Sequence, residues 1–138
     1  MDLDTAVGYA LKRAQVALRA AMDAALREHD LTVPQYSCLQ QLAQQPGLTN
    51  TELARGAFVS RQAMHQLLAT LKRLDLLQGD GGGRHERFYL TDTGARRLAG
   101  ASAAVATVEE RMLAPFDAQQ RQRLRADLAA CADALARS

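Results

Sequence analysis

The chain has 138 residues, of which 48% are hydrophobic, 4% are aromatic and 27 are alanine, and its net charge is +2. This length fits one domain or two small lobes, and the apolar fraction is sufficient for a core, which argues against disorder and against a multidomain enzyme. Because alanine favours helices and is a poor strand former, the composition predicts a mainly α protein.

Targeting signals and reactive motifs are missing from the sequence. No apolar stretch approaches the roughly 20 residues that a bilayer requires, and no basic start leads into an apolar secretion segment, so we expect a cytoplasmic protein with no membrane partner. Cys38 and Cys131 lack C-x-x-C spacing, and the three histidines lack metal-ligand spacing. With no phosphate loop, nucleophile elbow or zinc-protease motif either, we expect no enzyme, no cofactor and no metal site.

The first two predicted elements are helices. Apolar residues recur at steps of three and four over residues 3 to 28, which predicts a long amphipathic helix. Thr32 is followed three residues later by Gln35, the spacing of a capping box, and proline is tolerated in a first helical turn. We therefore expect a second helix over residues 33–44, ending at Pro46-Gly47.

Two further helices follow closely. Thr49 and Glu52 form another capping box, which opens a short third helix through about Ala57. Ser60 is a good N-cap for a fourth helix that reaches about Leu74. A short helix, a tight turn and a longer helix are the parts of a helix-turn-helix.

A hairpin and two more helices complete the chain. The glycine-rich run at residues 79–83 lies between Leu76-Leu77 and the β-prone run Arg87–Leu90, which predicts a small β-hairpin with a loose tip. Thr91 caps a fifth helix over residues 92–113. The chain then breaks at Ala114-Pro115-Phe116, and Asp117 with Gln120 opens the last helix.

This order of elements predicts a mainly α fold: a winged helix-turn-helix with a small β-hairpin wing, flanked by N- and C-terminal helices. We expect the winged helix-turn-helix lobe to cover residues 31–91, and the terminal helical region to comprise residues 1–30 and 92–138.

The fourth helix has one apolar side and one polar side. The predicted buried side consists of Ala63, Met64, Leu67, Leu68, Leu71 and Leu74. The other side carries Gln62, His65, Gln66 and Arg73, with Arg61 beside it. Near the N-terminus of such a helix these side chains match the donors and acceptors of the DNA major groove. We predict that the glutamines and the histidine read bases and that the arginines hold phosphates or bases; the alternative is a merely solvated face.

The hairpin and the helix N-termini support the same interpretation. Arg84, His85 and Arg87 cluster at the far end of the hairpin, where an arginine could follow a phosphate or enter a narrow minor groove. The helix N-termini capped by Thr49 and Ser60 could donate backbone N–H groups to phosphates. An ordinary solvated hairpin is the alternative.

Charge position matters more than total charge. Of the 17 basic residues 15 are arginine, whose guanidinium suits phosphates and base edges, although a GC-rich genome would produce the same excess. Between Thr49 and Gly94, six basic residues face five acidic ones, so this lobe is nearly neutral. DNA binding would therefore rest on individually placed arginines and on two copies of the lobe acting together.

Five segments, in order and spacing, resemble the multiple-antibiotic-resistance regulator (MarR) family of bacterial transcription factors. They are LTVPQY at 31–36, LTNTELA at 48–54, VSRQ at 59–62, LKRLDLL at 71–77 and YLTDTG at 89–94. The resemblance implies a homodimer built from the terminal helices, which makes residues 1–30 and 92–138 a dimerisation region. It also implies binding to a pseudo-palindromic operator in double-stranded DNA, usually as a repressor that a small molecule or an oxidant releases.

The sequence departs from the family at two positions. Arg84 matches the wing arginine of the family's Asp-x-Arg motif, but Gly82 stands where the aspartate belongs. The usual partner of that arginine is therefore missing, unless Asp80 replaces it. Asp75 stands in place of the usual glycine after the recognition helix, and Asp tolerates the left-handed conformation better than most residues.

In this family, effectors commonly bind between the dimer helices and the DNA-binding lobe. His29 and Tyr36 lie near that junction and are the candidate ligand-binding residues for a small aromatic or phenolic effector; the alternative for each is a local cap or core contact. Two alternatives remain open: a thiol-based redox sensor and a protein-interaction module without DNA binding. Cys38 and Cys131 both occupy apolar helix positions that favour packing, with a disulfide between subunits at Cys131 as the alternative.

Overall fold

The computed structural model describes residues 2–137, which form six α-helices, three short strands and one turn of 3-10 helix. In chain order these are α1 (Val7–Arg27), α2 (Val33–Gln44), β1 (Leu48–Thr49), α3 (Asn50–Ala57), α4 (Arg61–Arg73), β2 (Leu77–Gly79), η1 (Gly83–His85), β3 (Arg87–Leu90), α5 (Asp92–Leu113) and α6 (Ala118–Ala136). None of these helices is long and apolar enough to cross a membrane.

The side-chain caps predicted from the sequence are present. Thr32, Thr49 and Asp117 each form a complete capping box with the glutamine or glutamate three residues later. Ser60 and Thr91 accept a backbone N–H in the first turns of α4 and α5. These bonds satisfy donors that the helix itself leaves unpaired, which is why the helix starts could be read from the sequence.

The first helix begins later than its apolar pattern predicts, at Val7 rather than near residue 3. Asp2 is the reason, because its side chain accepts the N–H of Asp4 at 3.0 Å while its carbonyl accepts the N–H of Thr5 at 3.2 Å. Such local side-chain bonds compete with helix formation.

The three strands form an antiparallel sheet in the order β1-β3-β2. Leu77 pairs with Leu90 in the predicted hairpin. The unpredicted strand β1 pairs Leu48 with Phe88 across the opposite edge of β3. The hairpin is therefore joined on one side to the connection between α2 and α3.

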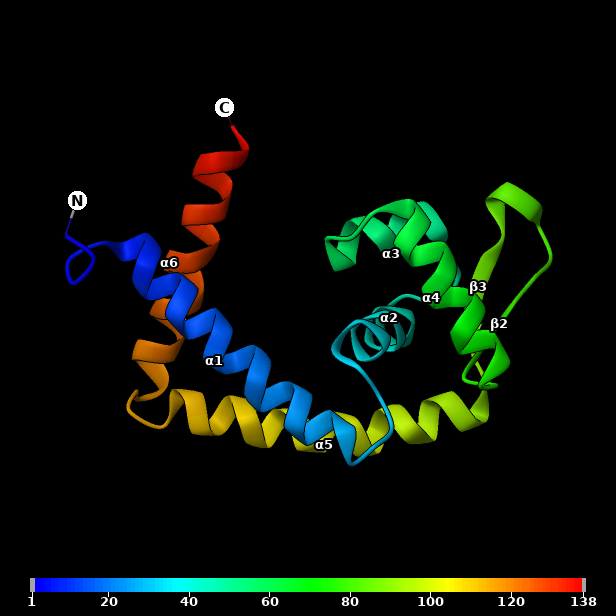
Figure 1. Cartoon of the computed structure of the whole chain (residues 1–138), viewed down its shortest axis with the longest axis horizontal. Helices are drawn as coiled ribbons and strands as arrows, with labels where there is room; N and C mark the ends of the chain where they lie inside the picture. Colours follow the sequence, from blue (N-terminus) through cyan, green and yellow to red (C-terminus); the bar gives the residue numbers. More distant parts are fainter. Residues whose placement is uncertain (1, 138) are drawn as a thin grey trace.

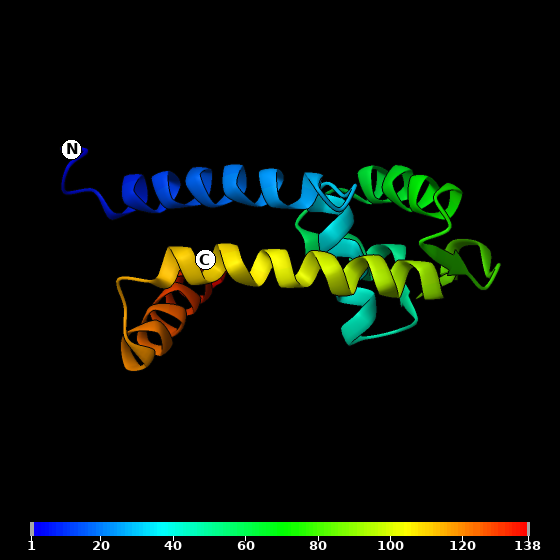
Figure 2. The same ribbon diagram turned by 90° about the horizontal axis from the view of Figure 1, so that it is seen from below.

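The molecule has two regions connected by α5. Figure 1 shows the helix-turn-helix and the hairpin at one end of α5, and α6 with the N-terminal part of α1 at the other. In Figure 2, α1 and α5 run side by side, and the chain termini lie away from the hairpin. The hairpin is thus held far from both termini.

The core lies beneath the helix-turn-helix. Leu39, Leu53, Met64, Leu71 and Leu76 are fully buried, and residues of α1 and α5 close the core from outside the lobe. This packing fixes which side of α4 faces inward.

Two members of the predicted apolar side of α4 were assigned wrongly. Ala63 and Leu74, at the two ends of the helix, are exposed. The apolar spacing predicted one buried residue too many at each end of α4, because the rest of the lobe packs only against the part of the helix between them.

Three backbone positions shape the lobe. Asp75 adopts a left-handed conformation with φ of 58°, as the sequence predicts. Phe58, between α3 and α4, also has a positive φ of 60°, which is an outlier for a bulky residue. Gly94 lies so close to the backbone of Leu76 that a Cβ atom would overlap the Leu76 carbonyl, so α5 begins in direct contact with the chain leaving α4.

Candidate nucleic-acid interface

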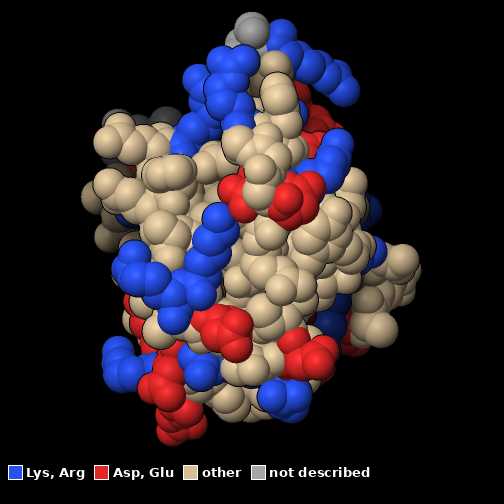
Figure 3. All heavy atoms as spheres, turned by 90° about the vertical axis from the view of Figure 1, so that its right-hand side faces the viewer, with Lys and Arg blue, Asp and Glu red and all other residues tan. Residues whose placement is uncertain are grey.

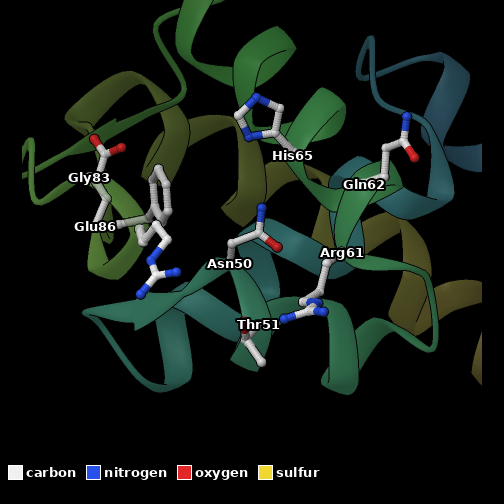
Figure 4. Close-up of a pocket in the computed structure, with 9 residues that line it drawn as sticks. Asn50, Thr51, Arg61, Gln62, His65, Gly83 and Glu86 are labelled. Atoms are coloured by element: carbon white, nitrogen blue, oxygen red, sulfur yellow. The ribbon is translucent and has the colours of Figure 1, made fainter.

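A hollow of about 500 Å³ lies between the starts of α3 and α4 and the hairpin wing. Its lining residues are Asn50, Thr51, Arg61, Gln62, His65, Gly83, Arg84, Glu86 and Phe88. Four of the predicted DNA-binding residues, Arg61, Gln62, His65 and Arg84, are therefore brought together from segments about twenty residues apart. Figure 4 shows Asn50 between the α4 residues and the wing residues Gly83 and Glu86.

The direction of the α4 side chains follows from its packing. Met64, Leu68 and Leu71 are buried on the inner side, so Gln62 and His65 are left exposed on the outer side. Ser60 fixes the first turn, because its hydroxyl accepts the N–H of Ala63 at 3.0 Å. Two polar side chains thus project from the first turns of a helix that is held rigidly from behind.

Asn50 and Thr51 are interface residues that the sequence reasoning missed. The amide group of Asn50 lies 3.3 Å from the Arg61 carbonyl oxygen and 3.2 Å from the His65 backbone nitrogen, oriented to satisfy both. It therefore joins the start of α3 to the first turn of α4. The capping motif drew attention to Thr49 and gave no signal for the two residues after it.

The remaining predicted residues of the helix-turn-helix lie outside the hollow. Gln66 is exposed on α4, and Arg73, at the far end of this helix, donates to the hydroxyl of Thr70 at 3.2 Å. The hydroxyl of Thr49 is occupied by its capping box, in which it accepts the N–H of Glu52 at 3.3 Å. Hydrogen bonds from Thr49 also lower the pKa of the Glu52 carboxyl.

The wing separates three residues that the sequence placed together. Arg84 and His85 lie in η1 at the tip and are exposed. Arg87 does not join them, because its guanidinium turns back and donates to the Gly47 carbonyl at 2.8 Å. The expectation of a three-residue cluster at the tip is therefore wrong for Arg87, which ties β3 to the loop before β1.

Asp80 does not replace the missing aspartate as a partner of Arg84. Its Oδ1 atom accepts the backbone N–H groups of Arg87 and Gly82, both at 3.0 Å. These hydrogen bonds lower the pKa of the Asp80 carboxyl, and the bond from the Arg87 N–H has the largest effect. Asp80 thus closes the wing loop, while Arg84 makes no hydrogen bond or ion pair with any other part of residues 2–137.

The surface charge agrees with a nearly neutral lobe. Figure 3 views the molecule from the end that carries the wing, and basic and acidic side chains are interspersed there. Attraction for DNA would therefore come from individually placed groups, since no field of one sign covers this face.

The predicted effector residues His29 and Tyr36 both face α5. The Tyr36 hydroxyl donates to the Ser102 hydroxyl, which in turn donates to the Gln40 side-chain oxygen, each over a long 3.5 Å. The Nδ1 atom of His29 lies against Gly100, two residues before Ser102 on α5. The sequence reasoning missed Gln40 and Ser102 because they meet only when α2 and α5 pack together.

The two cysteines differ in their surroundings. Cys38 is fully buried in the core, and this burial raises the pKa of its thiol to about 12. Because the thiolate is the reactive form, this burial leaves Cys38 mainly as the less reactive thiol near neutral pH. Cys131 is exposed on α6. Within residues 2–137, no three His, Cys, Asp or Glu side chains come together as metal ligands would.

Comparison with known proteins identifies the same architecture. Residues 29–85 match the model of the MarR family. The HTH-type transcriptional repressor Rv2887 of Mycobacterium tuberculosis (strain ATCC 25618 / H37Rv) is 36% identical over 122 residues, which cover 86% of this chain and 88% of the relative.

Solved structures extend the likeness to three dimensions. The structure of Rv2887 in complex with DNA is 33% identical, with a TM-score of 0.78, over 92% of this chain and 98% of that chain. Rv2887 has also been solved with salicylic acid, at 34% identity and a TM-score of 0.74 over 92% of this chain and 96% of that one.

A second relative is the transcriptional repressor CouR. Its complex with a 23-mer DNA duplex is 31% identical, with a TM-score of 0.85 and 94% of both chains covered. Its complex with p-coumaroyl-CoA has the same identity and coverage and a TM-score of 0.83. Since the likeness to these repressors spans nearly the whole chain and includes the helix-turn-helix and its wing, this protein belongs to the MarR family of DNA-binding transcriptional regulators.

Proposed function

We propose that this protein is a homodimeric repressor that binds a pseudo-palindromic operator in double-stranded DNA and is released by a small aromatic or phenolic effector. The observation that carries the proposal is the hollow in which Arg61, Gln62 and His65 of α4 lie beside Arg84 of the wing. An exposed polar helix next to a hairpin arginine fits a major groove and the phosphates or minor groove beside it.

The residues of the interface divide by chemistry. Gln62, His65 and Gln66 carry hydrogen-bonding groups that can distinguish base edges. Arg61 and Arg84 would neutralise phosphates, with Arg84 or His85 reaching a minor groove. Arg73 is exposed farther along α4 and would contact phosphates of the DNA backbone. Thr49 and Ser60 would act through the helix N-termini that they cap.

A dimer is supported by the exposed apolar surface of the terminal helices. None of the residues of α6 is buried, and apolar side chains such as Val16, Met112 and Leu128 are exposed on α1, α5 and α6. We infer that a second copy covers this surface, with residues 1–30 and 92–138 as the dimerisation region and residues 31–91 as the DNA-binding lobe. Two lobes would then read two half-sites, as a nearly neutral lobe requires.

Release by a small aromatic or phenolic effector is supported by the relatives. Rv2887 has been solved with salicylic acid, and CouR with p-coumaroyl-CoA. In this chain the junction of α2 and α5 holds Tyr36, Ser102 and His29, which can hydrogen-bond a carboxylate or a phenol. A ligand that bound there would press on α5, the helix that connects the two regions.

The proposal is tested by mobility-shift titration with duplexes from the region upstream of the protein's own gene. Specific binding should weaken steeply as salt rises from about 50 to about 200 mM. Arg84→Ala should weaken binding to all sequences and reduce the salt slope by about 1, whereas His65→Ala should alter which bases are preferred. Arg123→Ala, an exposed arginine on α6, serves as the control and should leave both properties unchanged.

Two results would reject DNA binding by this surface. One is a wild-type protein that binds no duplex at low salt, which would favour a protein-interaction module. The other is unchanged affinity and preference in both interface variants.

A thiol switch at Cys38 has little support, because a buried thiol with a raised pKa reacts slowly. We expect Cys38→Ser to respond to peroxide as the wild-type protein does. A release from DNA that peroxide triggers and Cys38→Ser abolishes would restore the redox-sensor alternative.

A further inference from the structure

The hollow contains an acidic side chain where a DNA-binding surface would normally be basic. Glu86, just before β3, has only 19% of its side chain exposed and lines the hollow beside Arg84. A free carboxylate in this place would repel phosphates. Glu86 is therefore expected to have a structural role that offsets this repulsion.

Glu86 has two partners on different segments. Its Oε2 atom accepts from Nζ of Lys72 at 3.1 Å and from the backbone N–H of Gly81 at 3.3 Å. Lys72 belongs to the last turn of α4, whereas Gly81 lies in the loop that follows β2. A single carboxylate thus connects the recognition helix to the tip of the wing.

The surrounding residues hold this connection in one geometry. A Cβ atom at Gly79 would overlap the Glu86 carboxylate, so the glycine leaves the space in which the carboxylate lies. The Lys72 ammonium also sits 5.2 Å from the centre of the Phe88 ring, within the range of a cation–π contact. Lys72 is therefore fixed by a carboxylate and by an aromatic ring of β3 together.

We propose that Lys72 and Glu86 form a wing latch that positions Arg84 for DNA, in place of the aspartate that Gly82 replaces. Glu86 is a positioning residue, since it contacts the wing backbone and α4 rather than Arg84. The latch also neutralises Glu86 inside the hollow. The inference rests on the proposed DNA binding, and it explains how this chain holds the wing in a fixed position relative to α4.

The latch should affect the position of the wing more than the stability of the fold, because partly exposed ion pairs contribute little to the free energy of folding. Lys72→Met combined with Glu86→Gln removes the pair without changing the net charge, so the general attraction for phosphates is preserved. We expect this double variant to unfold at nearly the wild-type urea concentration. In hydrogen exchange, its wing amides, including that of Gly81, should exchange faster than in the wild-type protein.

The decisive measurement is the loss of operator affinity caused by Arg84→Ala in two backgrounds. If the latch positions Arg84, this loss should be smaller by at least about twofold in the Lys72→Met/Glu86→Gln background than in the wild-type background. The matched control removes the exposed Arg19–Asp23 pair on α1 by Arg19→Met and Asp23→Asn. It is used at protein concentrations where sedimentation equilibrium shows the same association as for the wild-type protein, and it should then leave the Arg84→Ala loss unchanged.

Three outcomes overturn the wing latch. They are an equal Arg84→Ala loss in both backgrounds, the same reduction in the control pair, and wing amides whose exchange the double variant does not change. Failure of the wild-type protein to bind DNA would instead reject the proposed function. The exchange measurement needs no DNA, so it would still decide whether the wing depends on the latch.

Discussion

The DNA-binding lobe and the terminal helices are stabilised in different ways. The lobe is built around fully buried side chains from α2, α3, α4 and β2, whereas α6 spans 19 residues without one buried residue. Most of the stability of a helix in a protein comes from packing its apolar side chains against other parts of the structure. The difference indicates that the lobe is held by a buried core, which α1 and α5 complete, and that α6 depends on a partner surface, which we propose to be a second copy.

The largest expected effect is in the lobe core. Leu71→Ala removes a side chain with 0% exposure and should lower the free energy of unfolding by about 2–5 kcal/mol. Urea unfolding followed by circular dichroism measures this loss. Leu74→Ala, at the C-terminal end of α4 and 46% exposed, is the control and should cost far less. Equal costs would show that the lobe core is not where the structure places it.

A smaller effect is expected at the terminal helices, and it should appear in association rather than in folding of the lobe. Leu128 is 45% exposed on α6. If a second copy covers it, Leu128→Ala should remove about 1 kcal/mol per protomer and weaken the dimer about 30-fold. Sedimentation equilibrium measures this change. Leu74→Ala, of matched exposure in the lobe, should leave the dimer unchanged; a similar loss there would contradict the assignment of regions.

The capping boxes allow the same chemical change to be compared in both regions. Thr49→Ala should lower the stability of the lobe by about 0.5–2 kcal/mol, because it leaves the N–H of Glu52 without its acceptor. Asp117→Ala removes the equivalent bond in α6 and should increase local opening of that helix in hydrogen exchange while the lobe is unaffected. If Asp117→Ala lowered lobe stability as much as Thr49→Ala, the two regions would form one cooperative unit.

The smallest expected effect is an increase in stability. Phe58 is 94% exposed and left-handed, so its side chain contributes little packing. Phe58→Gly should raise stability by about 0.5–1 kcal/mol, since relief of the left-handed conformation exceeds the entropy cost of glycine. Thermal unfolding would detect this as a higher Tm. Val59→Gly is the control and should lower the Tm; a lower Tm for Phe58→Gly would mean that the side chain has a packing role.

The sequence predicted what is encoded locally. Five helix starts follow from side chains that bond to amides three residues away, and Asp75 takes the predicted left-handed turn. The face of α4 that carries Gln62 and His65 followed from apolar spacing. The MarR resemblance, carried by five short segments, was confirmed by the comparisons.

What the sequence did not predict depends on contacts between distant segments. Strand β1 is two residues long, too short for a periodic pattern, and exists through pairing with Phe88 and Arg87. Arg87 could not be separated from Arg84 by residue type, because only the fold brings the Gly47 carbonyl within its reach. Lys72 and Glu86 meet for the same reason, across fourteen residues of chain.

The direct contact between Gly94 and the Leu76 backbone makes α5 a lever. Its 22 residues span about 33 Å. At Gly94, in its first turn, the backbone of α5 contacts the backbone of Leu76 directly, with no side chain between them. A tilt of about 6° about the far end would carry the lobe about 3.4 Å, the rise of one base pair. If the protein is the two-fold dimer that we propose, both lobes would move. A ligand that displaced α5 slightly would then put the two lobes out of register with their half-sites.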